Sequence, residues 1–450
     1  MEEKQYRGGC EATPHQLLMI PGPTPVPQRI LLAGAQPMIN HRGPEFKAAL
    51  DECTAGLKRI FQTKHELYIL TASGTGGLEA AVVNVLSHGD KVLSVSIGVF
   101  GDRFATIAST YGAEVETLNF PMGTAADPKQ IAERLATDKS RGAAPCPERS
   151  RGKQPPRPLG SLVRGGSRPL TAGQNNGVLP VRTPEVKAVL VTQNETSTGV
   201  MNDMKAIGAV VRAHGALLLV DGISSLVAMD CQMDAWNIDV LVAGSQKAFM
   251  IPPGLCFIAV SDRAQAAMAD AKMPRFYFDL GAAKRYLQQG ETPWTPAVPQ
   301  VLQLREALKL LEKEGLQNCF ARHARLAKAT REGVKALGLK LLADEAVASN
   351  AVTSVRKPDG VDVAALRKLL REKYGVVLAG GQGSLKNDIF RIGHLGLVSE
   401  TDIIAVLGVL GIALKQLGVK VDPGAGAAAA VAALGKGCDS PRRTPQPSAG

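Results

Sequence analysis

Two residues with complementary chemistry each follow a short apolar run in the middle of the chain. Asp221 lies in LLLVDGISS, and Lys247 lies in VAGSQKAF, just after the apolar run Val240 to Ala243. Ligands bind at the carboxyl ends of the strands in an open α/β sheet, so both side chains are expected at one site. A lysine amine can attack a carbonyl carbon, and an aspartate can stabilise a neighbouring positive charge. A structural ion pair between them is the alternative.

A glycine-rich turn between an expected strand and an expected helix indicates an anion site. LTASGTGGLEAAV contains Ser73, Gly74, Thr75 and Gly76 at the point where the helix opens. The free N–H groups and the dipole of a helix N-terminus attract phosphate. The turn lacks the lysine of a nucleotide-binding P-loop, and a tight turn without a ligand is the alternative.

An aromatic ring and several hydrogen-bonding groups follow neighbouring strands. Phe100, in SIGVFGDRF, can stack on a flat ligand ring, although it can equally be a core residue. In TQNETSTGV, the hydroxyl of Thr196 or Ser197 can donate to a ligand or cap the following helix. Gln246, next to the lysine, is also placed to reach a ligand.

These groups match the needs of pyridoxal 5′-phosphate. An enzyme with this cofactor uses a lysine amine to form a Schiff base and an anion to keep the pyridine nitrogen protonated, and Lys247 and Asp221 suit these two roles. An amino-acid substrate also needs its carboxylate held in place. Arg391, in FRIGHLG, offers a guanidinium in a strand-like context for that purpose.

The elements that must position these residues alternate between strands and helices. The expected strands of the larger unit are the runs 67–71, 91–96, 187–192, 216–220, 240–243 and 255–260. This alternation predicts a mostly parallel sheet, and a smaller α+β unit is expected around residues 350–392. The predicted division is a flexible N-terminus over 1–16, a large cofactor domain over 17–270, a small domain over 271–420 and a disordered tail over 421–450, in which only a short alanine-rich stretch can form a helix.

Most of the net charge of +11 lies in one segment. Residues 141–182 contain eight Lys or Arg and one acid, which leaves +7 in a stretch rich in Pro and Gly and without aromatic residues. This composition predicts a disordered surface insertion. A basic loop can contact RNA or acidic lipid, but without aromatic residues a spacer is favoured, and neither a nucleic-acid nor a membrane partner is predicted.

The remaining composition indicates a packed protein of the cytoplasm. No window is long and apolar enough for a membrane span, and Met1 to His15 lacks the apolar core of a signal peptide. The seven cysteines are scattered, with no C-x-x-C pair and no accompanying histidine cluster. Free thiols are therefore expected, with neither a disulfide framework nor a metal site.

The motifs taken together resemble the class V aminotransferase family. SGTGGLEA, NETSTG, DGISS, GSQKAFMIPPG and FRIGHLG occur in the family's order and spacing, and PGPTPVPQRIL and NHRGPEF resemble the N-terminal segment of its alanine/serine–glyoxylate branch. The resemblance implies fold-type I of the pyridoxal-phosphate enzymes. That fold is α/β, with a mostly parallel seven-stranded sheet in a large domain and a smaller C-terminal α+β domain.

The resemblance also implies a role for each candidate residue. It makes Lys247 the Schiff-base lysine, Asp221 the pyridinium partner, Phe100 the stacking ring, Arg391 the carboxylate clamp, and Thr75 and Gly76 phosphate ligands. Many relatives have tryptophan at the position of Phe100. Family members are homodimers in which the neighbouring subunit completes the phosphate site, and QGETPWTPAV points to Thr292 or Thr295 for that contact.

The activity that the resemblance implies is transamination. An amino group moves from a small amino acid, alanine or serine, to glyoxylate or a similar 2-oxo acid in a ping-pong cycle. A cysteine desulfurase is one alternative, but that branch carries histidine just before the lysine, where this chain has Gln246. A catalytically idle subunit that keeps the scaffold is the other alternative.

Overall fold

The computed structural model describes residues 16–137 and 186–435 of the chain. The insertion predicted over 141–182 lies outside the described residues, as do residues 1–15 of the predicted N-terminal segment and residues 436–450 of the predicted tail.

The predicted seven-stranded, mostly parallel sheet is confirmed. Its order is β2-β10-β9-β8-β5-β3-β4, and within it only β10 runs against its neighbours. The strands are β2 (Glu66–Thr71), β3 (Lys91–Ser96), β4 (Glu114–Asn119), β5 (Ala188–Thr192), β8 (Leu217–Asp221), β9 (Val240–Gly244) and β10 (Leu255–Val260). Because β8 and β9 are adjacent and parallel, their carboxyl ends bring Asp221 and the turn with Lys247 to one edge.

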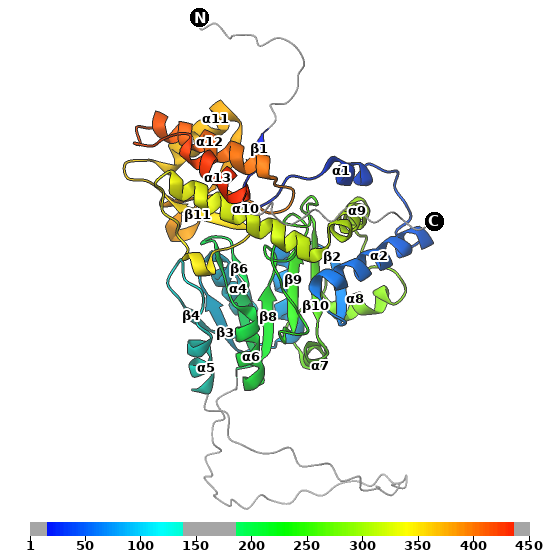
Figure 1. Cartoon of the computed structure of the whole chain (residues 1–450). Helices are drawn as coiled ribbons and strands as arrows, with labels where there is room; N and C mark the ends of the chain where they lie inside the picture. The colour runs from blue at the N-terminus through cyan, green and yellow to red at the C-terminus, as the bar shows by residue number, and fades with distance from the viewer. Residues whose placement is uncertain (1–15, 138–185, 436–450) are drawn as a thin grey trace, which may run out of the picture.

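The large sheet is buried on both faces, as the strand β8 shows. Leu218 and Val220 belong to one apolar core, and Leu217 and Leu219 belong to the other, because successive strand residues face opposite sides. A strand buried on both faces is a continuous apolar run, which is the pattern in this part of the sequence. The sheet is therefore the middle of three layers (Figure 1).

Helices cover both faces of this sheet. One face carries α2 (Pro44–Phe61), α5 (Pro128–Ala136), α6 (Met204–His214) and α9 (Val298–Glu314), and the other carries α3 (Gly74–Val85), α4 (Val99–Thr110), α7 (Asp262–Asp270) and α8 (Leu280–Leu287). No helix in the described part of the chain is long and apolar enough to cross a membrane.

A smaller sheet with its own apolar core lies above the large sheet in Figure 1. Its order is β1-β12-β13-β11, with β1 parallel to β12 and the other pairs antiparallel. Its elements are β1 (Leu17–Met19), α10 (Leu316–Ala336), β11 (Val352–Arg356), α11 (Val363–Tyr374), β12 (Val376–Gly380), β13 (Ile389–Gly393), α12 (Glu400–Gln416) and α13 (Ala425–Gly435). The short hairpin of β6 (Asn194–Glu195) and β7 (Val200–Met201) lies outside both sheets.

The first strand belongs to the small sheet, although residue 17 was predicted to open the large domain. Leu17 pairs with Val376, and Met19 pairs with Leu378. The partner strand lies near the other end of the sequence, so no local pattern could indicate this pairing. Past β1 the chain crosses to the large domain, where the Thr24 hydroxyl donates to the backbone carbonyl of Lys247 at 2.9 Å.

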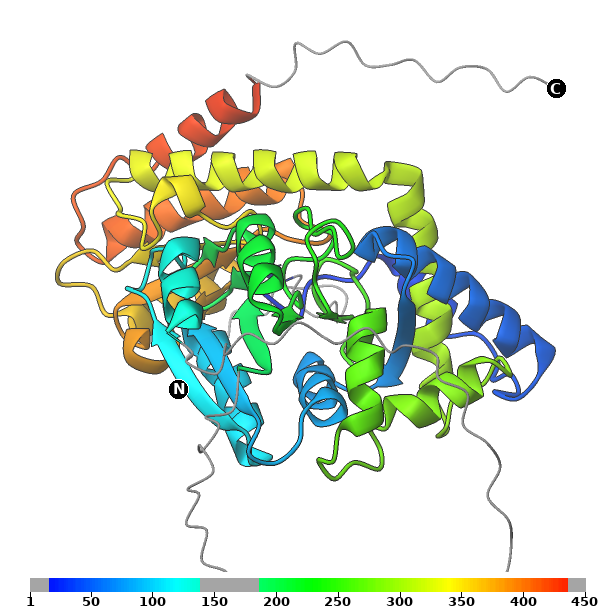
Figure 2. The same cartoon turned by 90° about the horizontal axis from the view of Figure 1, so that it is seen from below.

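The boundary predicted at residue 271 is also displaced. Helix α1 (Gln28–Gly34) and α2 pack against α9, whose Val301 and Leu304 belong to the core of the large domain. Gly315 has a positive φ of 84° and separates α9 from α10, and Figure 2 shows the bend where these two helices meet. The small domain therefore begins with α10 and not at residue 271.

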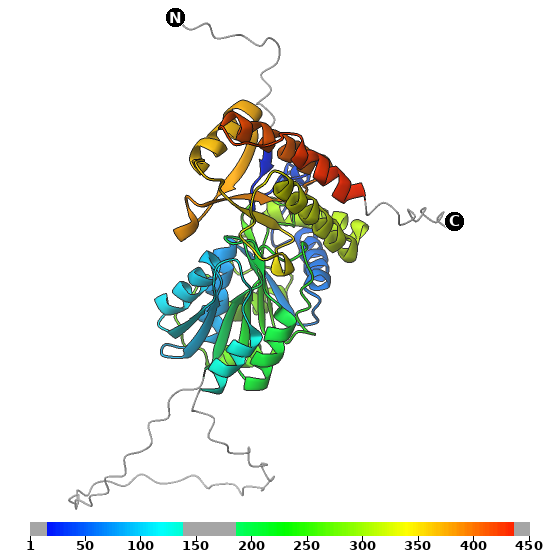
Figure 3. The ribbon, with the colours of Figure 1, turned by 60° about the vertical axis from the view of Figure 1, so that its left-hand side comes forward.

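Helix α13 corrects the disordered tail predicted from residue 421. The helix packs against α10 and α12, and Figure 3 shows it in red beside α10. Gly333 and Gly426 allow close contact, because a Cβ at Gly333 would lie 2.7 Å from the Gly426 carbonyl oxygen. The low-complexity composition suggested mobility, yet alanine favours helices and its small side chain suits a close helix contact.

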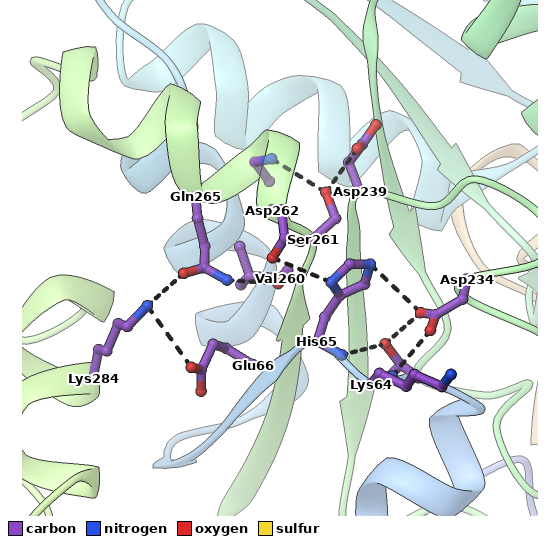
Figure 4. A network of polar contacts seen from close by, with 12 residues as sticks. Lys64, His65, Glu66, Asp234, Asp239, Val260, Ser261, Asp262, Gln265 and Lys284 are labelled. Atoms are coloured by element: carbon purple, nitrogen blue, oxygen red, sulfur yellow. Dashed lines mark hydrogen bonds and ion pairs between the residues drawn. The ribbon is translucent and has the colours of Figure 1, made fainter.

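Figure 4 shows a polar network at the amino edge of the large sheet, opposite to the predicted site. Lys284 on α8 lies 3.7 Å from Glu66, which begins β2. His65 lies 3.7 Å from a carboxylate oxygen of Asp234 and 3.4 Å from one of Asp262. Partly exposed ion pairs each contribute little to stability. We therefore assign this network to fixing the strand ends.

We predict that Ala430→Asp destabilises the fold by about 2 kcal/mol or more, because Ala430 is fully buried and an unpaired carboxylate there loses its hydration. Thermal unfolding of the full chain measures the effect. Ala432→Asp adds the same charge at an exposed position of the same helix and should change stability by less than about 0.5 kcal/mol. Equal melting temperatures for the two variants would show that α13 is not docked.

Candidate active site

Asp221 and Lys247 line one cavity of about 180 Å³ at the carboxyl edge of the large sheet. Asp221 is the last residue of β8, and its Oδ1 accepts a hydrogen bond from the Ile223 amide at 2.9 Å. Lys247 lies in the turn after β9, and its Nζ donates to the Pro21 carbonyl at 2.8 Å. The lysine therefore bonds to a backbone carbonyl instead of forming the structural ion pair that the sequence left open.

Burial moves the pKa of both groups toward neutral pH. Desolvation raises the pKa of Asp221 to about 7, against the opposing effects of the Ile223 amide, Lys247 and Arg103, and the nearby Glu195 raises it further. Desolvation also lowers the pKa of Lys247 to about 8, which Asp221 opposes. A substantial fraction of the Lys247 amine is therefore neutral near pH 8, and only the neutral amine is a nucleophile.

The predicted phosphate turn lies at the same cavity. Ser73, Gly74 and Thr75 line it at the N-terminus of α3, where amide groups of the first turn have no helical carbonyl to bond. A Cβ on Gly74 would lie 2.6 Å from the side chain of Ile223. Gly76, the fourth predicted residue, is not among the lining residues; its amide donates to Ser73 Oγ at 3.4 Å, and a Cβ added to it would lie 3.0 Å from Ala72 and from Phe278.

Phe100 lies at the start of α4 and lines the cavity, as predicted for a stacking ring. The sequence reasoning missed Arg103, which also lines the cavity and places its guanidinium 4.8 Å from the centre of the Phe100 ring. The spacing of three residues on one helix was the available signal, because such residues lie on the same face.

The turn that contains Thr196 contributes polar groups to the cavity. The Thr196 hydroxyl donates to Ser224 Oγ at 2.7 Å, and Asn194 Nδ2 donates to the same oxygen at 2.9 Å. Ser197 is directed elsewhere, because its hydroxyl donates to Glu195. Of the two hydroxyls proposed from the sequence, Thr196 is the one that lines the cavity, and Asn194 and Ser224 were missed.

Two buried acceptor atoms at this cavity have no hydrogen-bond partner among the described residues. They are Asn194 Oδ1 and Gln246 Oε1. A buried acceptor without a donor is costly, so a ligand that supplies donors is expected here. With the amine of Lys247, the carboxylate of Asp221 and the amides of α3, these atoms form a donor and acceptor set that fits pyridoxal phosphate.

Glu195 connects the N-terminus of α4, which carries Phe100, to the turn with Thr196. This buried carboxylate accepts hydrogen bonds from the amides of Phe100, Gly101 and Ser197 at 3.0, 3.1 and 3.0 Å. Burial raises the pKa of Glu195, and these hydrogen bonds oppose the shift. Its position thus couples the ring of Phe100 to the turn that carries Thr196.

Arg391 reaches the site from the small domain. The side chain is only 6% exposed, and its Nε donates to the Gly380 carbonyl at 2.8 Å while Nη1 donates to the Thr196 carbonyl at 3.0 Å. Burial lowers the pKa of Arg391 to about 10, so the guanidinium stays charged at neutral pH. Arg391 lines a cleft of about 570 Å³ that shares Phe100 and Lys247 with the first cavity.

The structure of one chain does not bring Thr292 and Thr295 to Lys247. Both line a separate cavity beside β2 and α8, and the Thr292 hydroxyl donates to the Trp294 carbonyl at 2.7 Å. The described residues contain no group of three or more His, Cys, Asp or Glu side chains that could hold a metal ion.

Comparisons with known proteins agree with this geometry. Residues 176–394 match the family described as Aminotransferase class-V. The chain is 34% identical over 422 residues to the serine–glyoxylate aminotransferase of Methylorubrum extorquens, covering 92% of this chain and 94% of the relative. It is 40% identical over 416 residues to a protein named soluble hydrogenase, small subunit, from Synechococcus, covering 92% and 97%.

A solved structure supports the same family. The crystal structure of pyridoxamine–pyruvate aminotransferase from Mesorhizobium loti superposes with a TM-score of 0.80 at 30% identity, covering 93% of this chain and 97% of that one. The architecture is that of fold-type I, and its cofactor is pyridoxal 5′-phosphate, as predicted from the sequence. By sequence, fold and the residues around Lys247, this chain belongs to the class-V aminotransferase family.

Proposed function

We propose that this chain transfers the amino group of alanine or serine to glyoxylate or a similar 2-oxo acid in a ping-pong cycle. The observation that carries the proposal is the position of the Lys247 amine, which lies between the buried Asp221 and a cleft that contains Arg391. The relative named serine–glyoxylate aminotransferase supports serine as donor and glyoxylate as acceptor.

When bound, pyridoxal 5′-phosphate supplies a carbonyl carbon for amines and a ring that accepts the electron pair released at the substrate Cα. Asp221 would stabilise the protonated ring nitrogen, and Phe100 would stack on the ring face. The amides of Gly74 and Thr75 would hold the phosphate at the N-terminus of α3. Thr196 would donate its hydroxyl to a ring oxygen.

Lys247 has two tasks in this scheme. Its neutral amine would hold the cofactor covalently, and it would become free when a substrate amine takes its place. The freed amine would accept the proton from the substrate Cα as a general base and return it to C4′ of the cofactor as a general acid. The Pro21 carbonyl, which accepts from Nζ at 2.8 Å, orients the amine for this transfer.

Arg391 determines where the substrate Cα lies. Its guanidinium can form a fork of two hydrogen bonds with the substrate carboxylate, and the carbonyls of Gly380 and Thr196 hold that guanidinium in place. Amino acids and 2-oxo acids share this carboxylate, so one clamp serves donor and acceptor in turn. A single clamp supports the ping-pong order, in which the first product leaves before the second substrate binds.

Half-reactions test this function. With alanine alone, the holoenzyme should release about one pyruvate per active site, and later addition of glyoxylate should yield about one glycine per site. Lys247→Ala should lower the rate at least about a thousandfold and remove the visible absorbance of the lysine-bound cofactor. Lys205→Ala, an exposed lysine on α6, is the matched control. Sulfide release from cysteine without pyruvate release from alanine would favour the desulfurase alternative.

The capture of cofactor by the apoprotein should depend on pH through Lys247. Because burial lowers the pKa of Lys247 to about 8, the neutral amine increases as pH rises and saturates above that value. The capture rate itself should rise about tenfold per pH unit below pH 8 and level off above it. Divided by the rate for free Nα-acetyllysine, whose amine has a pKa of about 10.4, it should be constant below pH 8 and fall about tenfold per pH unit from there to about pH 10. A ratio that stays constant up to pH 10 would contradict the lowered pKa of this lysine.

We also propose a homodimer whose partner subunit contributes Thr292 or Thr295. Phe276 is 76% exposed, and its ring centre lies 4.7 Å from that of Trp294, which forms an exposed aromatic cluster typical of interfaces. Tyr277, whose ring packs against those of Trp294 and Phe278, links this cluster to the phosphate turn, because a Cβ on Gly76 would lie 3.0 Å from Phe278.

Subunit complementation tests this arrangement. Lys247→Ala and the double variant Thr292→Ala with Thr295→Ala should each be impaired as homodimers. Mixed dimers formed by co-expression should regain activity, since one of their two sites combines an intact lysine with intact partner threonines. An unimpaired threonine variant, or mixed dimers without regained activity, would refute shared sites.

A further inference from the structure

The cleft between the two domains contains more cationic side chains than a substrate with one carboxylate requires. Arg367, Lys386 and Arg391 line it together with Lys247. None of the described residues that line this cleft is Asp or Glu. If one carboxylate occupies Arg391, two cations of the small domain remain without an anion.

Arg367 and Arg391 converge on the end of β12. Arg391 Nε donates to the Gly380 carbonyl at 2.8 Å, and a Cβ added to Gly380 would lie 2.9 Å from Arg367 Nη1. Arg367 Nε donates to the Leu378 carbonyl at 2.9 Å, which fixes the guanidinium on a backbone group. Gly380 therefore leaves space for two guanidiniums beside each other at the cleft.

Two carboxylates next in sequence to residues that line the cleft are bonded to other groups. Glu195 accepts hydrogen bonds from three backbone amides and from Ser197, and its charge partly offsets that of Arg391. Asp388 lies 3.5 Å from Lys357, away from the cleft. No ion pair involving Arg367 or Lys386 occurs among the described residues. Two guanidiniums with so little compensation favour a ligand with more than one negative charge.

We propose that Arg367 forms a second carboxylate subsite, so that the amino donors of this enzyme include amino dicarboxylic acids such as aspartate and glutamate. This inference rests on the proposed transaminase function. Arg391 binds the α-carboxylate, Arg367 binds the side-chain carboxylate in fork geometry, and Lys386 lies at the rim. The reaction balances without a further reactant, since the donor becomes a 2-oxo dicarboxylate and glyoxylate becomes glycine.

Steady-state kinetics with glyoxylate as acceptor test the subsite. The ratio of kcat/KM for L-aspartate to that for L-alanine should fall about tenfold or more in Arg367→Gln, because a charge-assisted hydrogen bond is lost. Arg367→Lys keeps the charge without the fork and should restore part of the ratio. Lys368→Gln removes the same charge from an exposed neighbour outside the cleft and should leave the ratio within about twofold.

Binding of unreactive acids separates this inference from the proposed function. Calorimetry on the holoenzyme should show succinate binding about tenfold more tightly than butyrate, with the preference lost in Arg367→Gln. Alanine turnover with equal binding of succinate and butyrate, or with an unchanged ratio in Arg367→Gln, overturns the subsite and leaves transamination intact. A succinate preference that depends on Arg367, without turnover of any donor, supports the subsite and refutes the proposed function.

Discussion

The hydrogen bonds that fix the segment after β1 to the turn with Lys247 are the constraint on which both cavities depend. The Thr24 hydroxyl donates to the backbone of Lys247, and the Lys247 amine donates to the Pro21 carbonyl. Gly22 makes this approach possible, since a Cβ there would lie 2.7 Å from the amine. Because β1 is also the edge strand of the small sheet, the same segment sets the position of Arg391 relative to the lysine.

Burial, more than pairing, determines the chemistry of the site. Desolvation is the largest influence on the pKa values of Lys247, Asp221 and Arg391. It lowers the pKa of Lys247 and of Arg391 and raises that of Asp221, which favours the neutral form of each group. Ion pairs within the protein would satisfy these charges and leave them unavailable to a ligand. Backbone carbonyls and amides hold them instead, which keeps each charged group oriented while its remaining bonding capacity faces the cavity.

The two domains contribute different parts of the site. The rigid carboxyl edge of the large sheet carries the groups that fit the cofactor, and Glu195 ties the helix of Phe100 to the turn of Thr196 through three backbone amides. The small domain contributes the guanidiniums of Arg391 and Arg367, which face the substrate side of Lys247. Under the proposed function, cofactor chemistry would depend on the sheet, and the choice of substrate would depend on side chains of the second domain.

From the sequence alone, Asp221 and Lys247 were predicted to share one site, because residues at the ends of neighbouring parallel strands lie at one edge of the sheet. Local patterns also indicated the phosphate turn and the strand with Arg391. The pairing of β1 with a strand from the far end of the chain and the docking of the low-complexity helix α13 are visible only in the folded chain. The folded structure also placed Arg367 beside Arg391, since contacts between distant segments depend on packing that no local spacing records.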